Sequence, residues 1–296
     1  MLTEEQINDI ISDINNNTGN TANVESQETE TAAETQNANE GEAPVGGEVE
    51  ANTTDENNLN ALTSPEFTER FSGAPWFDGC KNTILGIIGA GGISSWTTLL
   101  TARLNPAYIY IWDDDAVDST NMGGQFFRLN DIGIPKTVAL ESNVRMFCPH
   151  NTCIMCYTER YATQLSRNCD IYISGVDSMR SRREIFNILI RTNSAKWYID
   201  GRLSADAFQV ICVNMKNQDS ILAYERDFLF DDEDADRTIC SFKQTSYMAA
   251  MIASVITNIT VNIINNDCNI LEYVIPFYTE YNAATMKFIT RQHNEV

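Results

Sequence analysis

Apolar residues are distributed unevenly along the chain, and their distribution divides it into a tail and a body. Residues 15–62 are rich in Asn, Thr, Glu, Gly and Ala. A segment of this kind cannot bury enough apolar surface to offset the entropy lost on ordering. We therefore predict a disordered tail over residues 1–62 and one globular domain over residues 63–296.

The first residues of the tail depart from this pattern. Thr3 and Gln6 have the spacing of a helical capping box. The pattern predicts a short amphipathic helix over about residues 3–14, which is either a partner-docking segment or a frayed helix without a role. Its apolar stripe consists of Ile7, Ile10, Ile11 and Ile14.

In the body, short apolar runs alternate with helical patterns. The first run, Thr83–Ile88, ends in a glycine turn, and a helical pattern then starts at Ile93. This alternation predicts an α/β fold with a doubly wound, mostly parallel, Rossmann-like sheet. Further strands are expected at Ala107–Trp112, Thr152–Tyr157, Asp170–Ser174 and Lys196–Ile199, and helices at Lys136–Phe147 and Met179–Thr192.

The last third of the chain predicts additions to this sheet. Phe208–Met215 and Ser220–Tyr224 have the pattern of a hairpin at the sheet edge. A long apolar helix is expected at about Gln244–Ile264. Two strands, Leu271–Phe277 and Met286–Thr290, are expected to complete the fold.

The net charge of −21 is concentrated in the tail. Residues 1–62 contain 14 acidic residues and no Lys or Arg, whereas the body carries 27 acidic and 20 basic residues. Nucleic acids and anionic membranes bind clustered Lys and Arg, so we expect neither as a partner. No uninterrupted apolar run reaches the ~20 residues of a membrane span.

The N-terminal sequence and the cysteines predict the compartment. Residues 1–5 read Met-Leu-Thr-Glu-Glu, without the basic start and apolar core of a signal peptide. Eight cysteines without such a signal are typical of reduced thiols. We therefore expect a cytoplasmic protein.

The glycine turn after the first strand is a candidate phosphate-binding loop. It reads Gly89-Ala90-Gly91-Gly92, and Ser94 occupies the position of the third glycine in a G-x-G-x-x-G pattern. The Ser94 hydroxyl would still allow a hydrogen bond to phosphate. Asp113 closes the next strand, where a carboxylate binds ribose hydroxyls. The pattern favours a nucleotide over a merely structural turn.

Residues further along indicate which nucleotide binds. Asp113, Asp114, Asp115 and Asp118 are followed by Asn121, with Lys136 at a helix start and Asp177 after the fourth strand. A lysine and several carboxylates at one sheet edge fit a triphosphate with Mg²⁺ better than a nicotinamide. Lys136 taken alone would be interpreted as a solvated lysine. An NAD-linked oxidoreductase is the third alternative.

These motifs, in this order, resemble the ThiF/MoeB/HesA family, the adenylating domain of ubiquitin-activating enzymes. The resemblance covers about residues 66–265. It is carried by Glu69–Phe71, Gly89–Ser95, Asp113–Asn121, Asp131–Lys136, and Asp177 with Arg182 five residues later.

The resemblance implies ATP-dependent adenylation of a C-terminal carboxylate on a small ubiquitin-like or sulfur-carrier protein, by a homodimer. It implies that Asp113 holds the ribose, that Lys136 contacts the phosphates, and that Asp177 binds Mg²⁺ or orients the α-phosphate. Arg70 would reach into the partner subunit's site. The other residues implied to line the nucleotide site are Gly89, Gly91, Gly92, Asp115, Asn121 and Gln125.

The sequence departs from the family pattern at one phosphate contact. Gly124 stands where the family has an arginine that contacts the triphosphate. Arg128 could replace this arginine if the segment is helical, because residues i and i+4 share a helix face. The alternative function is therefore a nucleotide-binding scaffold of the same fold with weakened catalysis.

The cysteines give two further candidate sites. Cys153 and Cys156 form the one C-x-x-C pair, and without a second pair a four-coordinate zinc site is not expected. Cys240, before the long helix, is either an acyl-accepting nucleophile or a structural cysteine. Asp200–Arg202 is interpreted as a turn, which either directs Arg202 to the acyl substrate or is a plain surface turn.

Overall fold

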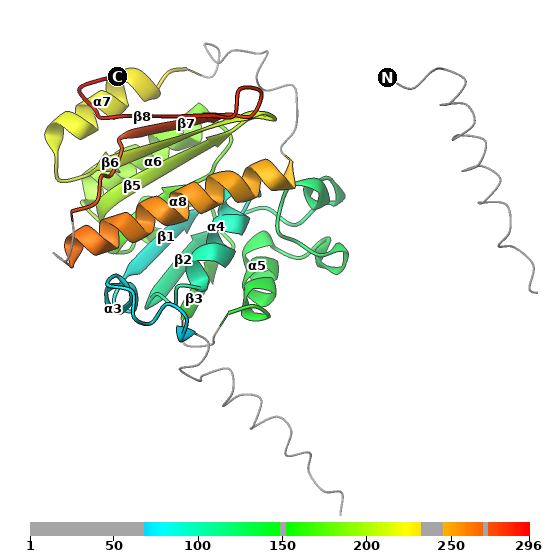
Figure 1. Ribbon diagram of the computed structural model, residues 1–296. Coiled ribbons are helices and arrows are strands. Elements are labelled where there is room, and N and C mark those ends of the chain that lie inside the picture. Colours follow the sequence, from blue (N-terminus) through cyan, green and yellow to red (C-terminus); the bar gives the residue numbers. More distant parts are fainter. Residues whose placement is uncertain (1–67, 149–151, 232–244, 269–271) are drawn as a thin grey trace, which may run out of the picture. The chain divides into compact units, whose positions relative to one another are not determined.

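The computed structural model describes residues 68–148, 152–231, 245–268 and 272–296, all within the compact unit Asn52–Val296. Its centre is an eight-stranded sheet in the order β3-β2-β1-β4-β5-β6-β7-β8 (Figure 1). The strands are β1 (Ile84–Ile88), β2 (Tyr108–Trp112), β3 (Cys153–Tyr157), β4 (Cys169–Ser174), β5 (Ala195–Leu203), β6 (Ala207–Asn214), β7 (Tyr278–Asn282) and β8 (Lys287–Arg291).

The sheet has a parallel half and an antiparallel half. Strands β1 to β5 pair in parallel, whereas β6, β7 and β8 are added antiparallel to β5. This confirms the predicted α/β fold, in which the strand order reverses direction between β1 and β4. In sheets of this kind ligands bind outside the carboxyl ends of the strands at that switch point.

Three helices cover one face of the sheet, namely α4 (Gly92–Ala102), α5 (Lys136–Arg145) and α8 (Ser246–Asp267), as Figure 1 shows. Alternate positions of the strands face them. Leu85 and Ile87 of β1, for example, belong to the same core cluster as Ile93 of α4 and Leu140 of α5. Because side chains alternate along a strand, the neighbouring positions face the opposite layer.

The opposite face is covered by α6 (Met179–Thr192) and α7 (Gln218–Phe228). Its core is rich in aromatic residues: Trp112, Tyr172 and Tyr198 from the strands pack with Phe186 of α6 and Tyr224 of α7. A short helix, α3 (Phe77–Cys80), precedes β1 and packs on α8.

Helix α8 is long and apolar enough, by length and composition, to cross a membrane. In this fold half of its most apolar window is buried. Ile252 and Ile256 are fully buried, and the helix packs against α4, β5 and β6. These contacts make α8 a core helix of the domain.

Two predictions for the C-terminal third are wrong. Ser220–Tyr224 lies in α7, which begins because the Asn217 side chain accepts hydrogen bonds from the backbone N–H groups of Asp219 and Ser220. The described part of Leu271–Phe277 is not a strand. The Asn266 side-chain amide accepts from the Tyr273 N–H at 2.7 Å and donates to the Tyr273 carbonyl at 2.8 Å. These backbone groups are therefore bound by a side chain rather than by a neighbouring strand.

Ser94 packs against Gly175, the residue that follows β4. It is fully buried, and its hydroxyl has no hydrogen-bond partner. A Cβ added at Gly175, after β4, would lie 2.6 Å from Ser94 Oγ and 3.0 Å from Ile93 Cβ. The small residue that allows close helix–strand packing is therefore Gly175. The Ser94 hydroxyl beside this strand end is unpaired, and its expected hydrogen bond to phosphate stays a prediction.

We expect Gly175→Ala to destabilise the protein by about 1–3 kcal/mol, because it overpacks this contact. In a Ser94→Ala background the loss should be smaller by at least ~0.5 kcal/mol, since the clashing oxygen is gone. Denaturant unfolding of the four proteins measures the coupling. Equal losses in both backgrounds would contradict the proposed contact.

Candidate functional site

The carboxyl ends of β1, β2 and β4 bring most of the predicted site residues to one edge of the sheet. The glycine loop follows β1, Asp113–Asp115 follow β2, and Asp177 follows β4. These strands are neighbours in the sheet, so segments that are far apart in the sequence meet there. The prediction that these motifs share one edge is confirmed.

The glycine loop presents the N-terminus of α4 to open space. Gly89 has φ of +88°, a conformation that favours glycine, and its N–H donates to the Trp112 carbonyl at 2.8 Å. Gly91 is the N-cap of α4, and no side chain caps the helix there. A Cβ added at Gly91 would meet nothing within 4 Å. Uncapped N–H groups beside open space fit the phosphates of a nucleotide.

Asp113 connects this loop to the end of β2. One carboxylate oxygen accepts from the Ala90 N–H at 2.6 Å, and the other accepts from the Asp115 N–H at 2.8 Å. Burial raises the pKa of the Asp113 carboxyl, and these two hydrogen bonds oppose that effect. Each carboxylate oxygen keeps a further lone pair, so Asp113 can still accept from a ribose hydroxyl.

Lys136 lies in the same cluster. Its ammonium is 2.7 Å from Asp115 Oδ2, and its side chain is only 9% exposed, whereas that of Asp115 is 67% exposed. The backbone supports this pair, because the Lys136 N–H donates to the Asp115 carbonyl at 2.9 Å. A largely buried ammonium whose partner is solvated can exchange that partner for a phosphate at modest cost.

The segment after Asp118 is fixed by local capping. Asp118 and Asn121 form a reciprocal capping box on the 3₁₀ turn Ser119–Gly123. Gln125 Oε1 is buried without a hydrogen-bond partner in the described structure, as is Thr137 Oγ1 beside Lys136. Unpaired polar atoms of this kind are available to a ligand.

Gly124 and Arg128 deviate from what a triphosphate clamp needs. The Gly124 carbonyl accepts from Trp96 Nε1 at 3.0 Å. Arg128 has an extended backbone, so the helical condition for Arg128 to replace the missing arginine is not met. Its guanidinium instead bonds the buried Asp131 carboxylate, at 2.9 Å, and the Met146 sulfur.

Asp200–Arg202 is not a turn, as predicted, but the continuation of β5. Arg202 does not extend toward the exposed edge, because Asp200 and the Phe228 carbonyl bind its guanidinium. Arg182 binds Asp200 and the Val176 carbonyl. Asp177, one residue after Val176, is exposed.

Arg70 lies away from the glycine loop of its own chain. It is exposed and precedes α3, which leads into the amino end of β1, whereas the glycine loop is at the carboxyl end of that strand. The next helix, α3, packs on α8, and a Cβ added at Gly79 would meet the side chains of Ile264 and Cys268 at the end of α8.

The buried cysteines among the described residues are poor nucleophiles, because burial disfavours the thiolate. Burial raises the pKa of Cys80, Cys156 and Cys169 to about 12, with Glu141 adding to the effect at Cys156. Cys153 and Cys156 are three positions apart on β3 and thus face opposite sides of the sheet. Cys240 lies outside the described residues.

One group of carboxylates has ligand atoms close enough to share a cation. Oxygens of Asp113, Asp114 and Asp115 lie within 4.8 Å of one another. Asp177 is not part of this group. The Asp113 oxygens already accept backbone hydrogen bonds, and Asp115 Oδ2 is paired with Lys136. The exposed Asp114 is therefore the freest cation ligand of the three.

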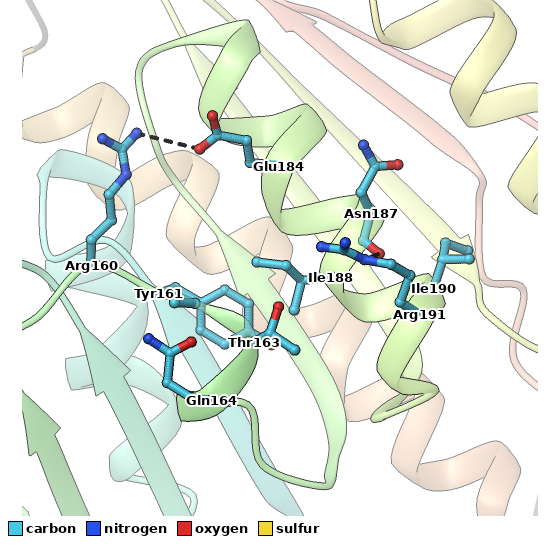
Figure 2. A pocket seen from close by; sticks show the side chains of 10 residues that line it. Arg160, Tyr161, Thr163, Gln164, Glu184, Asn187, Ile188, Ile190 and Arg191 are labelled. Atoms are coloured by element: carbon cyan, nitrogen blue, oxygen red, sulfur yellow. Dashed lines mark hydrogen bonds and ion pairs between the residues drawn. The ribbon is translucent and has the colours of Figure 1, made fainter.

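The cavity drawn in Figure 2 is a different place. It has a volume of about 570 Å³ and lies between the β3–β4 connection and α6. Arg160 and Glu184 form an ion pair of 4.0 Å at one end of it. None of the residues that line it belongs to the predicted site.

Comparison with known proteins identifies the family. The model of the ThiF family matches residues 71–295. The chain belongs to the ThiF family. This confirms the resemblance carried by the sequence motifs, and it supports adenylyltransferase activity at the level of the family.

Individual relatives of this ThiF-family chain are distant. A probable molybdopterin-synthase adenylyltransferase of Porphyra purpurea is 27% identical over 140 residues, 44% of this chain and only 36% of that relative. A solved structure of E. coli MccB with succinimide has a TM-score of 0.60 at 16% identity, covering 80% of this chain and 73% of that one. The structure of PaaA has a TM-score of 0.59 at 13% identity, covering 99% and 83%. These two likenesses show the fold.

Sequence reasoning missed the buried cluster around Asp200. The signal was present: Asp200 and Arg202 are two residues apart, so in a strand they share one face. The interpretation of Asp200–Arg202 as a turn excluded this shared face, because the predicted strand ends at Ile199 whereas β5 continues to Leu203.

Proposed function

We propose that this chain is an ATP-dependent adenylyltransferase that activates the C-terminal carboxylate of a small ubiquitin-like or sulfur-carrier protein, or of a peptide. One observation carries the proposal. Continuous hydrogen bonds join the glycine loop through Asp113 and Asp115 to Lys136, beside an uncapped helix N-terminus with open space above Gly91. This arrangement combines backbone donors, a cation and a ribose acceptor at one sheet edge.

The chemistry needs positioning rather than a protein nucleophile. A carboxylate oxygen of the substrate attacks the α-phosphorus of ATP, the bond to the bridging oxygen of the β-phosphate breaks, and pyrophosphate leaves. Negative charge grows on the departing pyrophosphate, and Lys136 would neutralise it. Asp113 would hold the ribose, and Gly89, Gly91 and Gly92 would lie against the phosphates.

The remaining roles follow the family pattern. Asp177 would bind Mg²⁺ or orient the α-phosphate, and Asn121 and Gln125 would line the site. Arg70 is remote from its own glycine loop and would serve the partner subunit of a homodimer. Cys240 would be the acceptor if the acyl group is passed on as a thioester. The protein would act in the cytoplasm.

Two structures of one solved relative, MccB, support a nucleotide and a second bound partner. The structure of E. coli MccB with ATP matches this chain with a TM-score of 0.55. MccB, described as a microcin C7 biosynthetic enzyme, has also been solved with N-formylated MccA. We extend this combination of ATP with a second bound partner to this chain.

Exchange of labelled pyrophosphate into ATP tests the assignment, with carrier proteins or peptides that end in Gly-Gly as acyl substrates. We expect exchange in the wild type and a loss of about 10²-fold or more in Asp177→Ala. Exchange that is indifferent to this substitution would refute the role of Asp177.

A nucleotide-binding scaffold is the second candidate, and Gly124 is the observation that favours it. A missing charged donor to phosphate costs on the order of 10²–10³ in rate, and Arg128 is bound to Asp131 instead. Calorimetry with ATP and Mg²⁺ separates the two functions. Tight binding without exchange would support the scaffold.

A further inference from the structure

Asp200 is the centre of a buried polar cluster beside the loop that carries Asp177. It is fully buried on β5, in register with Ser174, the last residue of β4. Arg182 binds its Oδ1. The Arg202 guanidinium, through Nε, and the Tyr224 hydroxyl both donate to its Oδ2 at 2.9 Å.

The cluster holds three backbone segments together. Arg182 uses its other nitrogen to donate to the Val176 carbonyl, and it also donates to the Gly201 carbonyl at 3.1 Å. Arg202 donates to the Phe228 carbonyl, at the end of α7, at 2.7 Å. The loop after β4 is therefore tied to β5 and α7 through one carboxylate.

Stability alone is a poor explanation for this arrangement. Removing three charged groups from water is costly, and buried ion clusters are often no more stabilising than well-packed apolar residues. Burial and the nearby Asp200 charge raise the pKa of Tyr224 well above 10, so its hydroxyl stays a donor. What such a saturated cluster provides is a fixed geometry.

We propose that Asp200 is a positioning residue, which acts through Arg182 to fix the Val176 carbonyl and thereby the direction of the Asp177 carboxylate. The inference rests on the adenylyltransferase function proposed above. Val176 and Asp177 are adjacent, so a loop that rotates when Arg182 is released moves Asp177 with it. A displacement of about 1 Å at a reacting group can lower the rate on the order of 10²-fold.

The kinetic test is Asp200→Asn in the pyrophosphate exchange assay. We expect kcat to fall at least about tenfold while the KM for ATP changes by less than about twofold. In an Asp177→Ala background the same substitution should lower kcat little further, because the two residues act as a unit.

A matched control is Asp170→Asn, at the opposite end of β4, where Asp170 bonds the Ile84 N–H and Lys196, each at 2.8 Å. It should lower the unfolding temperature without lowering kcat.

Hydrogen exchange of the backbone amides in residues 174–178 tests the positioning without any activity. Asp200→Asn should speed exchange there, and the milder Tyr224→Phe, which removes one hydrogen bond, should do so less. If Asp200→Asn does not fold, amide exchange in Tyr224→Phe is the test. Unchanged amide exchange, or an unchanged kcat in an active enzyme, would overturn the inference. A wild type without pyrophosphate exchange would refute the proposed function but not this reading of the loop.

Discussion

Lys136→Met should lower the rate of ATP–pyrophosphate exchange by about 10²–10³, because it removes the one cation in the hydrogen-bonded chain from the glycine loop. Methionine keeps the buried apolar stem of the side chain and deletes only the charge. The partner left behind, Asp115, is 67% exposed and remains hydrated, so we expect little change in the unfolding temperature.

The control for this substitution is Lys81→Met. Lys81 also forms an ion pair, 3.0 Å from Asp78, but it lies beside α3, outside the candidate site. Exchange should be unaffected there. If Lys136→Met and Lys81→Met behaved alike, Lys136 would be a structural lysine and the phosphate contact would be elsewhere.

Gly91→Ser should weaken ATP binding by about 10–100-fold and at the same time maintain or raise the unfolding temperature. Serine is a strong N-cap, and α4 has no side-chain cap, so its hydroxyl can satisfy a backbone N–H of the first turn. The same hydroxyl fills the open space and takes a donor that a phosphate would use. Losing one or two charge-assisted hydrogen bonds accounts for the expected loss of affinity.

The test is specific because Gly91→Ser should weaken ATP binding without lowering the stability of the protein. Calorimetry measures the affinity for ATP, and thermal unfolding measures stability in the absence of the nucleotide. Gly73→Ser is the matched control, since a Cβ there also meets nothing within 4 Å. It should change neither quantity. Unimpaired ATP binding by Gly91→Ser would mean that the nucleotide does not lie on this helix N-terminus.

The sequence predicted the parallel half of the fold and the glycine loop because both depend on local signals. Apolar runs, a turn rich in glycine and a helical stripe are each readable within about ten residues. The bounds of α6, Met179–Thr192, agree with the prediction, since Ser178 caps its first turn and Asn193 ends it in a left-handed conformation.

The predictions that failed depended on contacts between distant residues. Ser220–Tyr224 has apolar residues that suit a strand, but burial of Tyr224 against Phe186 and Tyr198 favours the helix. Spacing offers Arg128 to the phosphate only if its segment is helical, whereas Asp131, supported by Asn143, binds its guanidinium. Local patterns carry no information about such partners.

Adenylation of a C-terminal carboxylate can be tested with two forms of one peptide in the pyrophosphate exchange assay. Both end in Gly-Gly, one with a free carboxylate and the other with an amide. We expect exchange that requires the free carboxylate and is lost in Lys136→Met. Tight ATP binding with equal, background exchange for both peptides, across all candidate acyl substrates, would contradict adenylation and leave this ThiF-family chain as a nucleotide-binding scaffold.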